Sequence, residues 1–326
     1  MAKQRSKKEK QKSTNPHKSF KRSYREDYLR EAQTPGIMQH VVASFKIIFK
    51  NWKLFLPFLV IMVVLYVVLV GITSESSYVK FQDTLNQANV QMAGQEIGGV
   101  AKAGILLVSM VTTGITGESS GTAAVFGVLL FLVIWLVTIF FLRHKMAGHQ
   151  VTLQDGLYNA MTPMISTFVV FVVALIQCVP IFILIIAYSA AVQTEFLATP
   201  FYALMFFVFA ALMVLLSGYL LSSSLMALVA VSAPGLYPAK ALRTASDLMM
   251  GQRIRFVLRL VALIIVLVIL WVVIMLPLIL FDMWVKSFEW TAGIPFIPIC
   301  FTVMMCFTYI YVTTYLYMYY RWMLKI

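Results

Sequence analysis

Long apolar runs without a charged side chain divide the chain into segments. The hydrocarbon core of a bilayer is about 30 Å thick and needs about 20 apolar helical residues. The runs therefore predict six spans, roughly over residues 54–74, 120–142, 164–190, 200–232, 256–281 and 294–320. Backbone groups in lipid must bond within their own segment, and the runs lack the alternation of barrel strands. We therefore predict an all-α polytopic transmembrane helix bundle.

Proline and small residues mark where these helices begin or bend. Thr162-Pro163 and Thr199-Pro200 have the composition of helix starts. Pro180 should kink its helix, or a neighbouring side chain should bond the freed carbonyl, and the same holds for Pro277. A single helix over 200–232 would be about 50 Å long. It should tilt, project into water, or break near Gly218 or within Ser222–Ser224.

Short amphipathic stretches precede the spans. Residues 238–250 and, more weakly, 37–50 repeat apolar side chains at helical spacing and predict helices in the membrane interface. Residues 156–160 match 235–239 at four of five positions. This match suggests three units, each an interfacial helix followed by a helical hairpin, at about 36–142, 156–232 and 235–320. Chance similarity among small apolar residues is the alternative.

Composition narrows the class of protein. Of the 326 residues, 61% are hydrophobic and 12% are charged. An ordinary soluble domain is about 45–50% apolar and about 25% charged. With so few charges the chain cannot cover its own surface in water. The composition excludes a soluble globular enzyme, a disordered chain and a disulfide scaffold.

The basic residues predict an orientation. With the N-terminus inside, 23 of the 26 Lys and Arg residues fall in inner segments, and only Lys80, Lys102 and Lys286 lie outside. Cytoplasmic loops retain Lys and Arg, so we expect both termini in the cytoplasm. The sequence then divides into a disordered polybasic tail (1–35) and a transmembrane domain (36–326) with an outer-face insertion (75–118). The favoured role of the tail is attraction to anionic lipid. The second interpretation is that its charges only fix the topology of the chain, and binding to nucleic acid or the ribosome is the least favoured.

Two sets of residues are candidates for binding. Cations at the ends of predicted spans suit anionic lipid headgroups. They are Arg243, Arg253, Arg255, Arg259, Lys46 and Lys50. Polar and aromatic side chains inside the spans suit bonds between helices, with a neutral solute path as the alternative. They are Gln177, Ser217, Ser222, Ser223, Tyr311, Tyr315 and Tyr319. The three tyrosines form either an interfacial belt or an aromatic wall for an amphipathic ligand.

No residue pattern predicts catalysis, a cofactor or a metal. The middle of each predicted span contains no Asp, Glu, Lys, Arg or His, which argues against proton-coupled transport through charged residues and against a buried catalytic acid. His144 and His149 stand near Asp155 in one predicted inner loop, but a pair five residues apart on a short loop is a poor chelate.

Two segments carry a resemblance to a family. Residues 241–255, ALRTASDLMMGQRIR, lead into a long apolar helix, and residues 45–53, FKIIFKNWK, precede the first span. Over about 36–320 the chain resembles bacterial six-helix membrane proteins similar to the membrane domain of glycerophosphoryl diester phosphodiesterases. The resemblance implies a non-catalytic domain in a bacterial cytoplasmic membrane. The chain has no soluble phosphodiesterase domain, so we do not expect that activity.

These observations favour a non-enzymatic inner-membrane protein, either a scaffold or a binder of lipids or of other membrane proteins. The first alternative is a transporter or permease for a neutral or amphipathic solute. The second is a membrane assembly or insertion factor that uses its basic tail.

Overall fold

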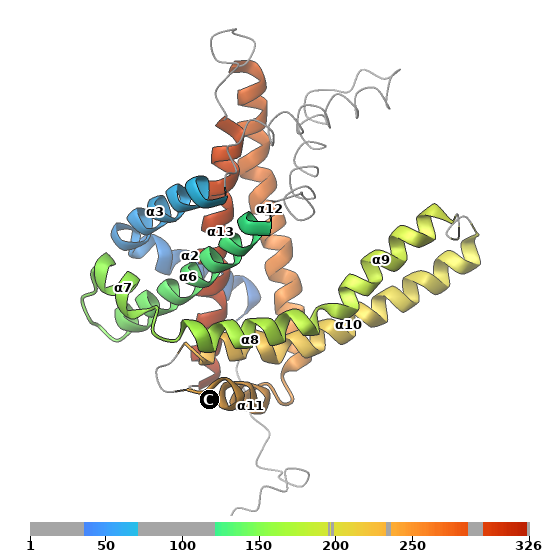
Figure 1. Cartoon of the computed structure of the whole chain (residues 1–326), viewed down its shortest axis with the longest axis horizontal. Coiled ribbons are helices and arrows are strands. Elements are labelled where there is room, and N and C mark those ends of the chain that lie inside the picture. Colours follow the sequence, from blue (N-terminus) through green and yellow to red (C-terminus); the bar gives the residue numbers. More distant parts are fainter. Residues whose placement is uncertain are drawn as a thin grey trace, which may run out of the picture. The chain divides into compact units, whose positions relative to one another are not determined.

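A computed structural model describes residues 36–70, 121–194, 196, 199–232, 236–285 and 296–324 (Figure 1). The predicted tail (1–35), the predicted insertion (75–118) and Lys286 lie outside these residues, as does Gly235 of the sequence match. All regular structure within the described ranges is helical, without a strand. The predicted all-α class is therefore confirmed.

Long apolar helices occupy each predicted span. They are α3 (Trp52–Val70), α6 (Gly121–Met146), α8 (Met164–Gln177) with α9 (Val179–Gln193), α10 (Pro200–Ala230), α12 (Arg253–Val285) and α13 (Phe296–Leu324). With α8 and α9 taken together, the described part of the chain has six segments long and apolar enough to cross a membrane. The six predicted spans are thus confirmed, and the protein belongs to the class of multi-pass membrane proteins.

A short helix precedes each pair of spans. These lead helices are α2 (Ile37–Lys50), α7 (Leu153–Asn159) and α11 (Pro238–Leu248). Each span pair also packs as neighbours: α3 on α6, α8 and α9 on α10, and α12 on α13. The chain therefore has the predicted order of a short helix followed by a helical hairpin, three times over.

Local sequence explains where the lead helices begin and end. At the start of α7, the Thr152 backbone N–H donates to Asp155 Oδ2 at 3.1 Å, and the Asp155 backbone N–H donates to Thr152 Oγ1 at 3.3 Å. This reciprocal pair is a capping box. The Thr152 hydroxyl also donates to Asp155 Oδ2, at 2.6 Å, and this bond lowers the pKa of the Asp155 carboxyl. Beyond α11, Gly251 adopts a φ of +76°, a left-handed conformation that suits glycine after a helix.

Two of the lead helices pack against the hairpin that precedes them in the chain, and the first lead helix packs against the third hairpin. Helix α7 contacts α6 of the preceding hairpin, and α11 contacts α10 and α8 of the hairpin before it. Within the described residues no hairpin precedes α2, and α2 packs against α13 and α12 of the third hairpin. The two ends of the described chain therefore meet through α2 and α13.

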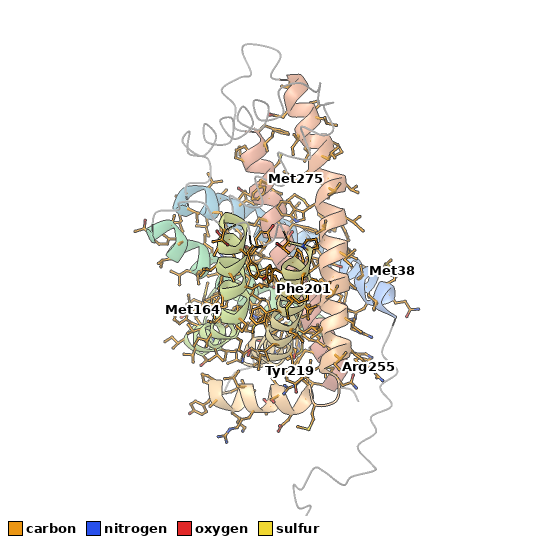
Figure 2. All side chains as sticks on the ribbon, turned by 90° about the vertical axis from the view of Figure 1, so that its right-hand side faces the viewer. Met38, Met164, Phe201, Tyr219, Arg255 and Met275 are labelled. Carbon is orange, nitrogen blue, oxygen red and sulfur yellow. The ribbon has the colours of Figure 1, made fainter. Side chains whose placement is uncertain are left out.

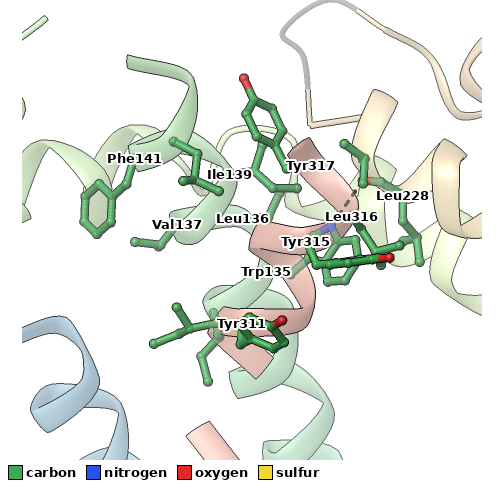
Figure 3. Packing of buried hydrophobic residues seen from close by; sticks show 14 of the residues in the cluster. Trp135, Leu136, Val137, Ile139, Phe141, Leu228, Tyr311, Tyr315, Leu316 and Tyr317 are labelled. Atoms are coloured by element: carbon green, nitrogen blue, oxygen red, sulfur yellow. Dashed lines mark hydrogen bonds between the residues drawn. The ribbon is translucent and has the colours of Figure 1, made fainter. Parts of the chain in front are cut away.

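Helix α13 packs against helices from every part of the described chain, namely α2, α3, α6, α10 and α12. Side-chain hydrogen bonds connect helices across this region. Tyr66 of α3 donates to the Gly127 carbonyl of α6 at 3.2 Å, and Trp135 Nε1 of α6 donates to the Leu228 carbonyl of α10 at 3.2 Å (Figure 3). Each bond pairs a polar group that lipid would leave unsatisfied.

The third predicted span is interrupted at Cys178, between α8 and α9. Pro180 follows the break and cannot donate a backbone hydrogen bond. The next N–H, that of Ile181, bonds to the Cys178 carbonyl, and the Gln177 carbonyl instead accepts from Ser217 Oγ of α10 at 2.8 Å. The predicted kink is therefore present, and a neighbouring helix satisfies the freed carbonyl. In contrast, α10 runs unbroken through Gly218 and the serines.

Candidate functional site

Helix α11 displays one protein-facing side and one charged side. Ala241 and Ala245 are buried against the helices that α11 contacts, α10 and α8. Lys240 and Arg243 are exposed. Because the apolar positions recur at helical spacing, packing one side of α11 necessarily turns these cations outward.

The first turns of α12 continue this basic surface. Arg253 Nη2 donates to Ser246 Oγ at 3.0 Å, and its guanidinium carbon lies 4.5 Å from the centre of the Tyr219 ring. Arg255 is exposed at this end of α12 (Figure 2). Arg253 is therefore held by α11 and α10, whereas Arg255 is available to an external group.

Helix α2 separates its charges in the same way. His40, Val41, Ser44 and Ile48 are buried. Lys46 and Lys50 are exposed. We call the exposed cations Lys46, Lys50, Lys240, Arg243 and Arg255 the basic rim.

Arg259 differs from the basic rim because it is only 5% exposed. Its guanidinium carbon lies 5.2 Å from the centre of the Tyr319 ring, within the range of a cation–π contact. On the α2 side, the His40 ring lies edge-on to the Tyr315 ring at 4.5 Å between centroids, and to the Tyr319 ring at 6.0 Å. We call His40, Arg259, Tyr315 and Tyr319 the Arg259 cluster. It joins α2, α12 and α13.

His40 is held in this cluster as a neutral ring. Its Nε2 lies 3.2 Å from the Tyr315 carbonyl and donates to it, which places the proton on Nε2. Burial lowers the pKa of His40, the bond to Tyr315 raises it, and the nearby Arg259 charge lowers it further. Burial is the largest of these effects, so the pKa of His40 lies below its ordinary value.

Two hydroxyls of the Arg259 cluster have no hydrogen-bond partner. Tyr315 and Tyr319 are fully buried, and the hydroxyl oxygen of each lacks a donor or acceptor within bonding distance. Gln252 Oε1, in the residue before α12, is another buried polar atom in this condition. Buried polar groups are nearly always paired, so these atoms point to a missing partner.

The predicted aromatic face of α13 is directed toward protein. Tyr311, Tyr315 and Tyr319 are each 0% exposed. Phe45 of α2 stacks on Tyr311 at 4.2 Å between ring centroids, and the Tyr311 hydroxyl lies 3.5 Å from the Val41 carbonyl. These three rings therefore pack against α2 and α12 and do not form a belt that faces surrounding lipid.

The predicted polar residues of the spans form two kinds of bond. Ser217 and Ser224 both donate to Gln177, at its carbonyl and at its Oε1 (2.8 and 2.7 Å), so they connect α10 to α8. Ser222 and Ser223 donate to carbonyls of their own helix, those of Tyr219 and Leu220. The structure thus brings Gln177, Ser217 and Ser224 together.

The sequence did not single out His40 or the pairing of α2 with α13. A signal exists, because His40 lies on the apolar side of α2, one turn before Ser44 and on the same side as Val41 and Ile48. A polar ring on a buried face needs a partner. That partner lies 275 positions away at Tyr315, a separation that a short-range pattern does not reveal.

No group of three residues suited to hold a metal ion occurs among the described residues. His144 Nδ1 lies 3.0 Å from the Phe140 carbonyl, and the His144 and His149 rings are 6.3 Å apart.

No protein-family model, curated protein or solved structure matches the chain.

Proposed function

We propose that this protein is a non-catalytic membrane protein that binds anionic lipid headgroups through its basic rim. The observation that carries the proposal is the position of the exposed cations. Arg243 and Arg255 lie on a short amphipathic helix and on the first turns of a membrane-length helix. Lipid phosphates lie at this level of a bilayer, and each nearby basic residue contributes about 1 kcal/mol of attraction.

Two further parts of the proposal rest on the sequence. The concentration of Lys and Arg in alternate loops supports a cytoplasmic basic rim with both termini on that side. The family resemblance supports a bacterial inner membrane and a non-enzymatic role, as a scaffold or lipid binder.

The alternatives receive less support from the described contacts. A neutral solute path would need polar groups that remain available, but Gln177, Ser217 and Ser224 bond to one another. An assembly or insertion factor would depend on residues 1–35, which lie outside the described chain. Its test is whether ribosomal RNA copurifies with the protein and is lost when that segment is deleted.

The proposal is tested by the lipids that accompany the purified protein. The protein is reconstituted in nanodiscs that contain phosphatidylglycerol and phosphatidylcholine, then extracted, and the bound lipids are quantified by native mass spectrometry. We expect enrichment of phosphatidylglycerol. Reversing two charges (Arg243→Glu with Arg255→Glu) should reduce that enrichment about tenfold or more.

The matched control keeps both charges (Arg243→Lys with Arg255→Lys) and should retain most of the enrichment. Bulk lipid composition around the unaltered protein, or full enrichment after charge reversal, would contradict a lipid-binding basic rim.

A further inference from the structure

The Arg259 cluster contains two hydroxyl groups whose position has no explanation within the protein. Tyr315 and Tyr319 lie one helical turn apart on α13, are fully buried, and have hydroxyl oxygens with no hydrogen-bond partner. A phenolic hydroxyl is both a donor and an acceptor, and burying it unpaired costs about 1–3 kcal/mol. Two such groups side by side favour an outside ligand over two unrelated defects.

The charge around these hydroxyls selects the kind of ligand. The Arg259 guanidinium lies over the Tyr319 ring and carries a permanent positive charge. The His40 Nε2 proton is already donated to the Tyr315 carbonyl. The two hydroxyls can therefore donate to a ligand beside a cation, and both properties match an acceptor with negative charge.

Water fits this arrangement less well than an anion does. A buried water could bridge the two hydroxyls, since each phenolic oxygen also accepts, but water carries no charge that would interact with the nearby Arg259 guanidinium. The other buried side-chain oxygens without a partner among the described residues are Thr138 Oγ1 on α6 and Gln252 Oε1, which precedes α12. An anion accepts from both hydroxyls and from a guanidinium at once, and such charge-assisted bonds are stronger than neutral ones.

The position of the cluster suits a ligand that arrives from the membrane surface. Arg259 lies six residues inside the start of α12 at Arg253, about 9 Å along the axis. Arg255, one turn earlier on the same side of α12, is exposed. A phosphate held first at Arg255 would need to move about one turn deeper to reach the cluster.

We propose that the Arg259 cluster binds a phosphate-type anion, which accepts hydrogen bonds from the Tyr315 and Tyr319 hydroxyls beside the Arg259 guanidinium. The phosphate belongs either to an anionic lipid headgroup or to a soluble compound. The lipid source rests on the proposed function, whereas the anion site itself does not.

Thermal unfolding of the full-length protein in mild detergent tests this proposal. Three probes are titrated: inorganic phosphate, short-chain phosphatidylglycerol, and sodium chloride at matched ionic strength as the control for screening. We expect phosphate, phosphatidylglycerol or both to raise the unfolding temperature well above the effect of chloride. Stabilisation by phosphatidylglycerol alone identifies a lipid source, and stabilisation by phosphate alone identifies a soluble one.

The variants Tyr315→Phe and Tyr319→Phe remove the hydroxyls and keep the rings. Each should weaken the apparent affinity for the stabilising probe about tenfold, because a hydrogen bond to a charged group is lost. Without a probe, neither variant should be less stable than the unaltered protein, since the hydroxyls are unpaired in the protein alone. Tyr320→Phe on the same helix is the matched control and should behave like the unaltered protein.

Two results would overturn the anion site: no probe stabilises the protein beyond chloride, or the double Tyr→Phe variant keeps the full stabilisation. In the second case the stabilising anion binds elsewhere on the protein. The variant Lys240→Glu with Arg243→Glu separates the two proposals, because it reverses two charges of the basic rim on α11 and leaves Arg255 and the Arg259 cluster unaltered. It should retain the effect of inorganic phosphate even where it loses lipid enrichment. Failure of either proposal is thus visible without the other.

Discussion

Helix α6 and the α9–α10 hairpin are both strongly apolar, yet they pack in opposite ways. In its most apolar stretch, α6 has 56% of its residues buried inside the protein, whereas α10 has 6%. Helix α6 contacts α3, α8 and α13. The buried residues of α10 all lie in its second half, from Ser217 onward, and α9 packs chiefly on α10 (Figure 1).

The comparison shows that apolar composition alone does not determine whether a helix faces protein or lipid. The exposed side chains of the hairpin include Phe201 (Figure 2), Leu204 and Phe207. An exposed apolar surface along a whole helix would be unfavourable in water. In a bilayer these side chains face lipid tails, which are as apolar as the protein interior. Burial within protein should therefore decide which apolar substitutions cost stability.

The largest effect is expected from truncating a ring between α3 and α6. Phe141 is fully buried and lies edge-on to Phe55 and Phe58. Phe141→Ala should destabilise the protein by about 3–5 kcal/mol, because it removes packing and leaves a cavity. Phe207→Ala in the hairpin, where the side chain is 60% exposed, should cost less than about 0.5 kcal/mol. Chemical unfolding in detergent measures both, and equal costs would remove the distinction between the two regions.

The second effect concerns two glycines. A Cβ at Gly156 would overlap the Phe141 ring, whereas a Cβ at Gly218 would lie 3.7 Å from Val257, an ordinary contact. Gly156→Ala should therefore cost about 1–3 kcal/mol through overpacking. Gly218→Ala should be neutral or stabilise α10 by up to about 1 kcal/mol.

Thermal unfolding compares the two glycine variants. The second substitution Phe141→Leu should recover part of the loss in Gly156→Ala, since it makes room for the added methyl group. If Gly218→Ala proved the more harmful variant, the close packing of α7 on α6 would be wrong.

The third effect is a pH dependence at His40. Its pKa in the folded protein is lowered, chiefly by burial, so the unfolded chain binds the proton more readily. The contribution of His40 to stability is complete above the unfolded pKa of about 6.5, and it is lost as the pH falls below that value. The loss can reach about 1.4 kcal/mol per pH unit. The groups that face the ring are Arg259 on α12, whose charge also lowers the pKa of His40, and Tyr315 and Tyr319 on α13.

Unfolding temperatures between about pH 7.5 and about pH 5.5 test this dependence. The His40→Gln variant, which keeps a side-chain donor, should flatten the profile. A profile of unchanged slope in that variant would show that other groups control the acid sensitivity.

The smallest effect separates two neighbouring serines of α10. Ser224→Ala leaves Gln177 Oε1 without its donor from α10, whereas Ser223 bonds only to a carbonyl of its own helix. We expect Ser224→Ala to cost about 0.6 kcal/mol, the average for a hydrogen bond between membrane helices, and Ser223→Ala to cost less. Thermal unfolding in detergent measures both costs, and an equal loss of stability in the two variants would argue against this role.

The sequence was sufficient for the helices because hydrophobicity and proline act locally. The predicted start at Thr199-Pro200 and the interruption by Pro180 are both present. The order of short and long helices is confirmed as well. The burial of individual side chains could not be predicted from local signals, because it depends on helices that are distant in the chain.

Arg255 and Arg259 illustrate this limit. Four residues apart, they share one side of α12, and the sequence gives both the same role at the membrane surface. The structure buries Arg259 against Tyr319 and leaves Arg255 exposed. The difference arises from the contact of Arg259 with Tyr319 of α13, and no property of α12 itself encodes that contact.

The pairing of α2 with α13 has a consequence for biogenesis. Among the described helices, translation produces α2 first and α13 last. The neighbours of His40 and Ser44 on α13 are absent until α13 has left the ribosome, and the five other described spanning segments precede it. A nascent chain that stops before α13 should therefore expose α2 to proteases, and a chain that includes α13 should protect it.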